Sequence, residues 1–328
     1  MKKPIHRRWW FILLEVLLGL SIGLAIALIT STVLQEHAIR LICSMGANPS
    51  ADELPGVLTL RSDASYQSEY PNGTFDLYSI HSNEPLPLVV YAHGGYYVGG
   101  DKSSLTEYCR AIASHGYVVA NINYQLAPEG RYPTQVLQMN EAVSYLIKHA
   151  KAYGIDPSRV FLGGDSAGGH LASQMGLYYT NDDFCRKAGG EPAILADQLR
   201  GVLLLCGYYD TETVRETHFP MIADSIWVLT GEKAFEGTEV SARMNTVAQV
   251  TPDYPPAFLL CGDQDPFLSQ AEELIVALAK NGVETSVYLP ESGEESLGHE
   301  FQLDLTSAAG KEGLERLLQF LSDQSQPS

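Results

Sequence analysis

The chain has 328 residues, of which 45% are hydrophobic, enough apolar material for one large α/β domain or two small ones. It carries 21 Lys and Arg against 39 Asp and Glu, and most of this negative charge lies beyond the first 40 positions. Nucleic acid is excluded as an expected partner, because its binding depends on basic surface. Strongly anionic substrates are disfavoured, and a solvated acidic surface that keeps the protein soluble is the simpler interpretation.

The N-terminus begins with a basic segment, residues 1–8, and continues into an apolar run. Residues 16–34 contain no charged side chain, and only Glu15 interrupts the wider run from Trp9. A run of this length can span a bilayer core of about 30 Å. The sequence therefore predicts a transmembrane anchor over residues 9–34, at the cell membrane, with the basic end in the cytoplasm and the body outside. A cleaved signal peptide and a secreted body are the alternative, although the run is long and lacks a clear Ala-x-Ala site.

The segments that flank the main body are short. Gly19 and Gly23 have the spacing that packs one membrane helix against another, which allows a homodimer. Residues 35–56 are expected to form a linker or short helix that leads into the body, and residues 323–328 a disordered tail.

The body, residues 57–322, alternates between strand and helix patterns. Its strand-like segments are GVLTLR, FDLYSI, LPLVVYAH, YVVANINY, RVFLGG, GVLLLCG, PAFLLCG and TSVYLP. Helical spacing of apolar residues is clearest at 134–150 and recurs at 268–281 and 308–322. This alternation predicts an α/β fold, a mostly parallel sheet with helices on both faces. Residues 208–250 interrupt it with mixed aromatic and polar sequence, and we expect them to form a cap over a site.

The five cysteines form no CxxC pair and no regular spacing. We therefore expect neither a disulfide scaffold nor a zinc site. Cys206 and Cys261 lie in two similar apolar segments, VLLLCG and AFLLCG, and are expected to be buried thiols that pack as small apolar side chains.

The segment FLGGDSAGGH places a single serine, Ser166, among small residues between a strand pattern and a helix pattern. A strand, a tight turn and a helix in this order form a nucleophile elbow. Gly164 and Gly168 would let strand and helix approach closely, because a Cβ at either position would clash with the neighbouring element. The Ala167 N–H would lie at the helix N-terminus, where the dipole favours negative charge. A plain glycine-rich loop is the alternative, so the serine needs partners elsewhere in the chain.

A second glycine-rich segment, VVYAHGGYYVGGDKSS, follows another strand pattern. It does not fit a phosphate-binding loop, because Asp101 separates Gly100 from Lys102 and its carboxylate would repel phosphate oxygens. Small residues here would instead bring backbone N–H groups towards the serine. Two or three such donors stabilise the charge that develops on a carbonyl oxygen during acyl transfer.

The chain has nine histidines, and His299 is the best candidate for a base. It lies in SLGHEF, after the last strand pattern and before the C-terminal helix, and this suits the chain order Ser…Asp/Glu…His. The others lie in the basic tail, in loops or on helix surfaces. Among them, His93 is expected to order the glycine loop and His170 to pack or cap in the elbow helix.

The acid is expected just past the strand pattern AFLLCG, because sites in α/β sheets gather at strand ends. Asp263 and Asp265 both lie there, and spacing alone leaves the choice open. Pro266 favours Asp265, since a residue before proline is held in extended geometry. Asp263 is expected to accept backbone N–H bonds within the turn.

Five motifs together resemble the α/β-hydrolase superfamily, and most closely the hormone-sensitive-lipase-like esterases and acetyl-esterase-type hydrolases. They are HGG (93–95), YQLAPE (124–129), GDSAGG (164–169), GDQDP (262–266) and GHEF (298–301). The resemblance covers about residues 55–322. It implies Ser166 as nucleophile, Asp265 as acid and His299 as base. It also implies supporting roles in the two glycine-rich loops for His93, Gly94, Gly164 and Gly168.

The same resemblance implies an oxyanion hole formed by the N–H groups of Gly95, residue 96 and Ala167. Position 96 departs from the family, since many members have a third glycine where this chain has Tyr96. HGGY is also found in kynurenine-formamidase-like members, so cleavage of amides or formamides is the alternative to ester cleavage.

From the motifs and the resemblance we expect a membrane-anchored carboxylesterase that cleaves short acyl esters through an acyl-enzyme. We expect it to need no cofactor and no metal. Its expected partners are a small-molecule ester substrate and, through the N-terminal helix, the membrane. An amidase or peptidase on the same fold is one alternative, and a catalytically silent binding protein is another, because a fold does not fix a function.

Overall fold

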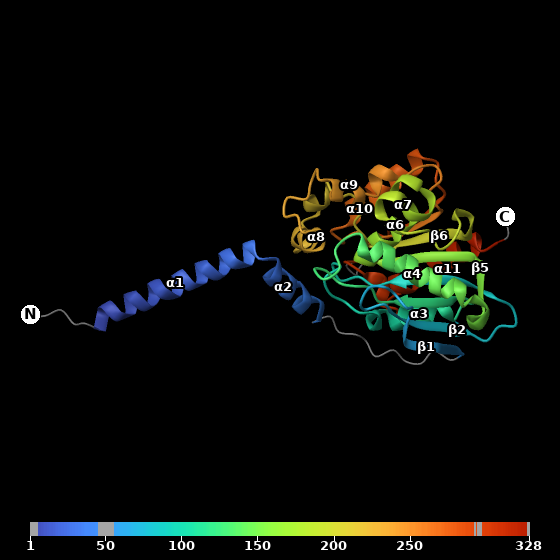
Figure 1. Ribbon diagram of the computed structural model, residues 1–328, viewed down its shortest axis with the longest axis horizontal. Helices are drawn as coiled ribbons and strands as arrows, with labels where there is room; N and C mark the ends of the chain where they lie inside the picture. Colours follow the sequence, from blue (N-terminus) through green and yellow to red (C-terminus); the bar gives the residue numbers. More distant parts are fainter. Residues whose placement is uncertain (1–5, 45–55, 292, 294–296, 327–328) are drawn as a thin grey trace, which may run out of the picture.

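The computed structural model of the chain describes residues 6–44, 56–291, 293 and 297–326, and it describes residues 6–9, 24–30 and 44 by their backbone alone. Figure 1 shows a layered body from which one long helix, α1 (His6–Thr30), projects. A second helix, α2 (Thr32–Ser44), lies between α1 and the body. α1 therefore projects away from the body, whereas α2 packs against the body through α8 (Ile222–Thr230).

In the described part of the chain, eight strands form one sheet in the order β1-β2-β4-β3-β5-β6-β7-β8. Their bounds are β1 Val57–Ser65, β2 Thr74–Ile80, β3 Leu86–Ala92, β4 Val118–Ile122, β5 Ile155–Asp165, β6 Leu199–Leu205, β7 Ala257–Leu260 and β8 Thr285–Tyr288. β2 runs antiparallel to both of its neighbours, and the pairs from β4 to β8 are parallel. The predicted α/β fold with a mostly parallel sheet is confirmed, and each predicted segment overlaps one strand.

Helices cover both faces of the sheet, because successive side chains of a strand point to opposite faces. In β3, Val89 and Tyr91 pack with α3 and α11, whereas Leu88 and Val90 pack with α4, α6 and α10. The bounds of the helices around the sheet are α3 Thr106–Ala113, α4 Thr134–Lys148, α5 Ala150–Tyr153, α6 Ala167–Thr180, α7 Asp182–Ala188, α10 Leu268–Lys280 and α11 Ala308–Gln324. Short 3-10 turns lie at η1 Lys102–Leu105, η2 Ala196–Gln198 and η5 Phe301–Leu303.

The helices predicted at 134–150, 268–281 and 308–322 correspond to α4, α10 and α11. α11 continues to Gln324, so the first two residues of the expected disordered tail are helical. The backbone carbonyls of Gln324 and Gln326 accept hydrogen bonds from Arg200, which ties this end of the chain to β6. Residues 327–328 lie outside the described residues.

The expected cap at 208–250 contains η3 Val214–Thr217, α8 Ile222–Thr230, α9 Glu239–Met244 and η4 Val247–Gln249. α8 packs against α2, and Ile39 of α2 is fully buried in the same apolar cluster as Ile222 and Ile226. The segment expected as a linker or short helix at 35–56 is therefore a packed helix up to residue 44, and residues 45–55 lie outside the described residues.

The expected membrane anchor at 9–34 is not supported. Within the residues that the structure describes, there is no helix whose length and hydropathy would let it cross a bilayer. The side chains of residues 24–30, which belong to the expected anchor, lie outside the described part.

Candidate active site

Ser166 occupies the turn between β5 and α6. β5 ends at Asp165, α6 begins at Ala167, and Ser166 alone joins them with φ 51° and ψ −116°. A positive φ is rare for a residue with a side chain and persists only where the surroundings impose it. Here the Ser166 N–H donates to the carbonyl of Leu205 on the neighbouring strand at 2.8 Å, and the Ser166 carbonyl accepts from the N–H of His170 at 3.0 Å.

The turn depends on two glycines that lie against backbone atoms. A Cβ on Gly168 would lie 2.0 Å from the carbonyl oxygen of Ala92, at the end of β3. A Cβ on Gly164 would lie 2.4 Å from the carbonyl group of Gly168. These neighbours are main-chain atoms within a packed sheet and helix, so neither contact can be relieved by a side-chain rotation.

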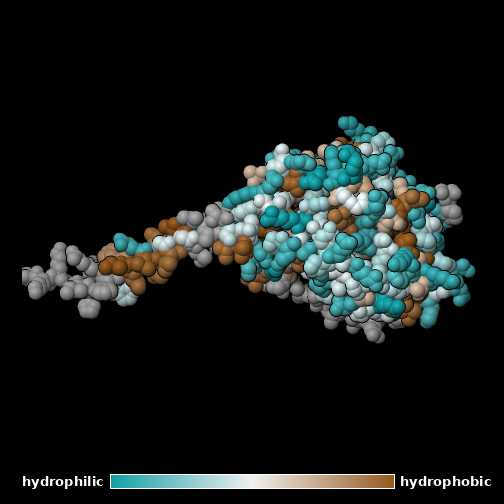
Figure 2. Space-filling view, in the orientation of Figure 1, coloured by the Kyte–Doolittle hydropathy of each residue, from teal (hydrophilic) through white to brown (hydrophobic). Residues whose placement is uncertain are grey.

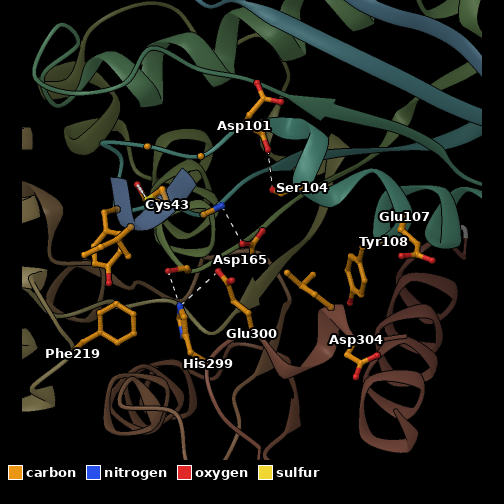
Figure 3. Close-up of a pocket in the computed structure, with 18 of the residues that line it drawn as sticks. Cys43, Asp101, Ser104, Glu107, Tyr108, Asp165, Phe219, His299, Glu300 and Asp304 are labelled. Atoms are coloured by element: carbon orange, nitrogen blue, oxygen red, sulfur yellow. Dashed lines mark hydrogen bonds and ion pairs between the residues drawn. The ribbon is translucent and has the colours of Figure 1, made fainter. Parts of the chain in front are cut away.

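Three side chains from distant parts of the sequence meet at this turn, and one of them, His299, is labelled in Figure 3. His299 Nε2 lies 3.0 Å from Ser166 Oγ, and His299 Nδ1 lies 2.8 Å from Asp265 Oδ2. The other oxygen of Asp265 accepts from the N–H of Phe267 at 2.9 Å, and Asp265 is only 4% exposed. Of the two aspartates in the loop after β7, Asp265 is thus the one hydrogen-bonded to the histidine.

The environment of His299 favours its charged form. Burial by itself lowers the pKa of His299, whereas the hydrogen bond to Asp265, the charge of Glu300 when that group is ionised and the charge of Asp265 raise it, and the resulting pKa lies above 6.5. A carboxylate in this position holds the imidazole with its proton on Nδ1 and stabilises the imidazolium that forms when Nε2 takes a proton.

The loop after β3 lies directly beside Ser166. A Cβ on Gly94 would lie 3.1 Å from Ser166 Cβ, and Gly95 has a φ of 110°. The Gly95 carbonyl accepts from the N–H groups of Val98 and Gly99 at 3.0 and 2.9 Å, which makes the loop a tight turn. Gly95 and Tyr96 line the same cavity as Ser166. Ala167 adds an N–H that has no acceptor within its own helix.

His93 orders this loop. It is fully buried, its Nδ1 lies 2.6 Å from the Gly94 carbonyl, and its ring stacks on Tyr124 at 4.4 Å. Burial lowers its pKa, so it stays neutral near physiological pH. These contacts fit a role in shaping the loop.

His170 belongs to the packing beneath the site. Its two ring nitrogens bond to the Tyr97 hydroxyl and the Met244 carbonyl, both at 2.8 Å, and burial lowers its pKa to about 4. It therefore joins the elbow helix to the cap.

The site opens into a cavity of about 920 Å³. One wall of the cavity is aromatic. The ring centroid of Phe219, from the cap segment, lies 4.7 Å from that of His299, 4.3 Å from that of Phe267 and 5.5 Å from that of Tyr96. The expected cap therefore reaches the site, and its aromatic side chains narrow the space beside the histidine.

Helix α2 supplies another wall, which the sequence analysis missed. Arg40, Ile42 and Cys43 line the cavity, and Arg40 Nε donates to the carbonyl of Val98 at 3.1 Å. Cys43 Sγ lies 3.8 Å from the Gly95 carbonyl. The signal that was available is the amphipathic spacing of residues 33–43, which predicts a helix with one face packed on the body.

Two carboxyl groups at the site were also missed. Asp165 is 2% exposed, its Oδ2 accepts from the Gly94 N–H at 3.0 Å, and burial raises its pKa to about 6. Glu300 Oε1 lies 3.7 Å from His299 Nε2. Withdrawal from water and the neighbouring charge of Asp165 raise the pKa of Glu300 to about 8.

A metal does not fit the site well. Among the described residues, Cys206, Asp265 and His299 place potential ligand atoms within 4.8 Å of one another. Burial raises the pKa of the Cys206 thiol, which donates to Gln302 Oε1 at 3.3 Å. Since the thiolate is the metal ligand, a protonated thiol makes this group a poor metal site.

Ser166 lies in an elbow at the carboxyl end of β5, a central strand of a mostly parallel sheet. It faces a histidine that is held by a carboxylate. This arrangement defines the chain as an α/β hydrolase. Residues 75–278, more than half of the chain, match the BD-FAE family model, and the chain belongs to that family. The α/β-hydrolase resemblance predicted from the five motifs is confirmed.

Solved structures of similar fold are named esterases. A C6-C4 SN3 inhibited esterase B from Lactobacillus rhamnosis has 25% identity and a TM-score of 0.72, covering 94% of this chain and 97% of that chain. A bacterial heroin esterase has 25% identity and a TM-score of 0.68, covering 90% and 92%.

The isoprenylcysteine alpha-carbonyl methylesterase ICME of Arabidopsis thaliana is 27% identical over 203 residues, which are 60% of this chain and 47% of that protein. An esterase of Gibberella moniliformis is 36% identical over 94 residues, 28% of this chain and 30% of that protein. The chain thus spans about half or less of the length of these relatives.

The geometry at His299 predicts a titration that can be measured directly. We expect NMR titration of the wild-type protein to give a pKa above 6.5 for His299, and Asp265→Asn to lower it by about one unit or more, because a hydrogen-bonded counter-charge is removed. Since the folded-state pKa is raised, the imidazolium stabilises the fold below about pH 6.5, and this contribution is lost as the pH rises through the folded-state value.

Asp263→Asn is the matched control, because it makes the same change two residues away, and it should leave the titration of His299 unchanged. Both variants need native thermal unfolding. A pKa that responds to Asp263 and not to Asp265 would contradict the geometry.

Proposed function

We propose that the protein is a serine hydrolase of carboxylic esters, with Ser166 as nucleophile, His299 as general base and Asp265 as the acid that orients it. The observation that carries the proposal is the unbroken hydrogen-bond chain from Ser166 Oγ through both ring nitrogens of His299 to Asp265. The similar proteins that are named esterases support the reaction class.

In the proposed cycle, Ser166 Oγ attacks the ester carbonyl while His299 Nε2 takes its proton. Asp265 stabilises the resulting imidazolium, and the N–H groups of Gly95, Tyr96 and Ala167 receive the negative charge of the tetrahedral intermediate. The imidazolium then protonates the departing alcohol and leaves an acyl group on Ser166. Water, deprotonated by His299, attacks this ester, and collapse of the second intermediate releases the acid and restores the serine.

We propose short acyl esters as substrates. The rings of Tyr96 and Phe219 lie close together beside His299, and this limits the depth available to an acyl chain near Ser166. The Lactobacillus esterase B is described with a C6-C4 inhibitor, and such chain lengths agree with a shallow acyl pocket.

Ser166→Ala should abolish ester hydrolysis, with a loss in kcat of about 10⁴ or more, because it removes the nucleophile and leaves only binding and oxyanion stabilisation. It should also abolish labelling by a fluorophosphonate probe. The measurement is initial rates on acetyl and butyryl esters together with probe labelling.

Ser322→Ala, an exposed serine on α11, is the control and should behave as the wild-type protein. Turnover near the wild-type rate in a well-folded Ser166→Ala protein would rule out the serine mechanism. A wild-type protein that neither hydrolyses esters nor takes the probe would favour a binding function.

Substrate profiling should give kcat/KM values that peak between acetyl and butyryl esters and fall for long acyl chains. Phe219→Ala should move this peak to longer chains, because it removes a ring from the wall beside His299. A wild-type preference for long-chain lipids would contradict the proposal. A preference for N-formyl amides would favour the formamidase alternative.

We also propose that the N-terminal helix holds the protein at the cell membrane with its body outside the cytoplasm. The large side chains from Trp10 to Ile22 on α1, apart from Glu15, are apolar and exposed, and Figure 2 shows much of this helix in brown. Exposed apolar surface costs about 25 cal/mol per Å² in water, so a helix of this kind is stabilised when lipid covers it.

Cell fractionation should recover the protein with membranes, and protease added outside intact cells should release its body. A cytoplasmic protein of known location serves as the control for intact cells. Mature protein in the soluble fraction that begins near residue 33 would instead indicate a cleaved signal peptide.

A further inference from the structure

Two carboxyl groups flank the proposed catalytic pair along the chain. Asp165 precedes Ser166 and Glu300 follows His299. Their carboxyl groups lie together beside Gly94, and two carboxylates at this place repel each other unless one of them carries a proton. Oδ1 of Asp165 is buried and has no donor among the described residues. A proton held between the two groups removes the repulsion between them.

The backbone places both groups against the loop after β3. A Cβ on Gly94 would lie 2.7 Å from Asp165 Oδ2 and 2.8 Å from Glu300 Oε1, so the two carboxyl groups occupy the space that a side chain would need. Glu300 adopts a φ of 61°, which is rare for a residue with a side chain. Its side chain keeps 30% of its surface exposed, and this part faces the cavity.

Among the residues that the structure describes, no fixed cation compensates two charges at this place. Arg40 lines the same cavity, but its guanidinium pairs with Glu36 at 2.9 Å and with Glu129 at 2.7 Å. The titratable groups that face Glu300 are Asp165, His299, Asp265, Cys43, Tyr96 and Tyr124. Among them only His299 can become positive, and two adjacent carboxylates therefore resist joint ionisation.

We propose that Asp165 and Glu300 share one proton at neutral pH and together clamp the loop after β3, with Glu300 as a neutral positioning residue beside His299. Glu300 donates to Asp165, and Asp165 accepts from the Gly94 N–H. This fixes the loop that carries the N–H groups of Gly95 and Tyr96 next to Ser166. Tests of this proposal by pH profiles of kcat/KM rest on the proposed hydrolase function, whereas a test by infrared spectroscopy does not.

Loss of the shared proton changes the charge of the site. Ionised Glu300 brings a second negative charge to the place where the oxyanion develops, and its Oε1 lies 3.7 Å from His299 Nε2. This charge opposes the oxyanion and draws the imidazolium away from the leaving group. With the pKa of Glu300 at about 8, activity rises with pH as His299 loses its proton and falls again as Glu300 ionises.

Glu300→Gln separates the hydrogen bond from the charge, because its amide still donates to Asp165 but does not ionise. We expect kcat/KM near neutral pH to stay within about threefold of wild type. In the pH profile of kcat/KM, the rise at acid pH (the acid limb) should be unchanged, and the fall at alkaline pH (the alkaline limb) should be absent. Glu315→Gln, the same change at an exposed position of α11, should keep the wild-type profile. An alkaline limb that persists in Glu300→Gln would overturn the proposal. An acid limb that moves to lower pH in this variant would also overturn it, because that result means that Glu300 is charged at neutral pH.

Asp165→Asn should shift the alkaline limb of the pH profile in a defined direction. The asparagine carbonyl still accepts from Gly94, but the negative charge that raises the pKa of Glu300 is gone. The alkaline limb should therefore move to lower pH. A limb that stays in place, or moves to higher pH, contradicts the coupling of the two groups.

Infrared difference spectra of the wild-type protein test the shared proton without any activity or variant. A carboxylic-acid C=O band should disappear as the pH rises through about 8, with carboxylate bands appearing in its place. Absence of a titrating carboxylic acid near this pH overturns the proposal even if the protein is an esterase. Its presence supports the shared proton even if the ester-hydrolase proposal fails.

Discussion

The whole site depends on one close contact, that between the first turn of α6 and the end of β3. There is no room for a side chain at Gly168, because a Cβ would lie 2.0 Å from the carbonyl oxygen of Ala92. This contact holds α6 against the sheet and leaves a single residue, Ser166, to reverse the chain at φ 51°. The same approach brings Gly94 beside Ser166 and buries Asp165. Close packing of main-chain atoms therefore helps to maintain the strain at the serine.

The charges at the site follow from where the chain places carboxyl groups around one imidazole. Asp265 bonds to Nδ1 of His299, and Glu300 lies on the Nε2 side. The surroundings of these two carboxyl groups differ. Asp265 accepts hydrogen bonds from a backbone N–H and from the imidazole N–H, whereas Glu300 faces a second acid, Asp165. In a protein with a net charge of −18, a neutral Glu300 keeps the region of the oxyanion free of one further negative charge.

Local patterns predicted the strands, the main helices and the elbow, because periodicity, glycines and chain order are visible in the sequence. The spatial strand order was not predictable, since the pairing of β2 with β4 depends on contacts between separate segments. The wall formed by α2 was missed, because its role depends on packing against the cap. The catalytic roles of Ser166, His299 and Asp265 stay predictions that the geometry supports.

The carboxyl pair shows where sequence reasoning ends. Asp165 and Glu300 lie in two motifs that the sequence analysis used, yet nothing local to either motif indicates that the two side chains meet. Their meeting depends on tertiary structure, and their pKa values depend on burial and mutual repulsion.

The central claim is that Ser166 and the loop after β3 form one acyl-transfer site. The most direct measurement is a crystal structure of the protein after reaction with a short-chain alkyl phosphonate. We expect phosphorus bonded to Ser166 Oγ, and the phosphoryl oxygen about 2.7–3.1 Å from the N–H groups of Gly95, Tyr96 and Ala167. Phosphorus on another residue, or a phosphoryl oxygen turned away from these three groups, would contradict the account.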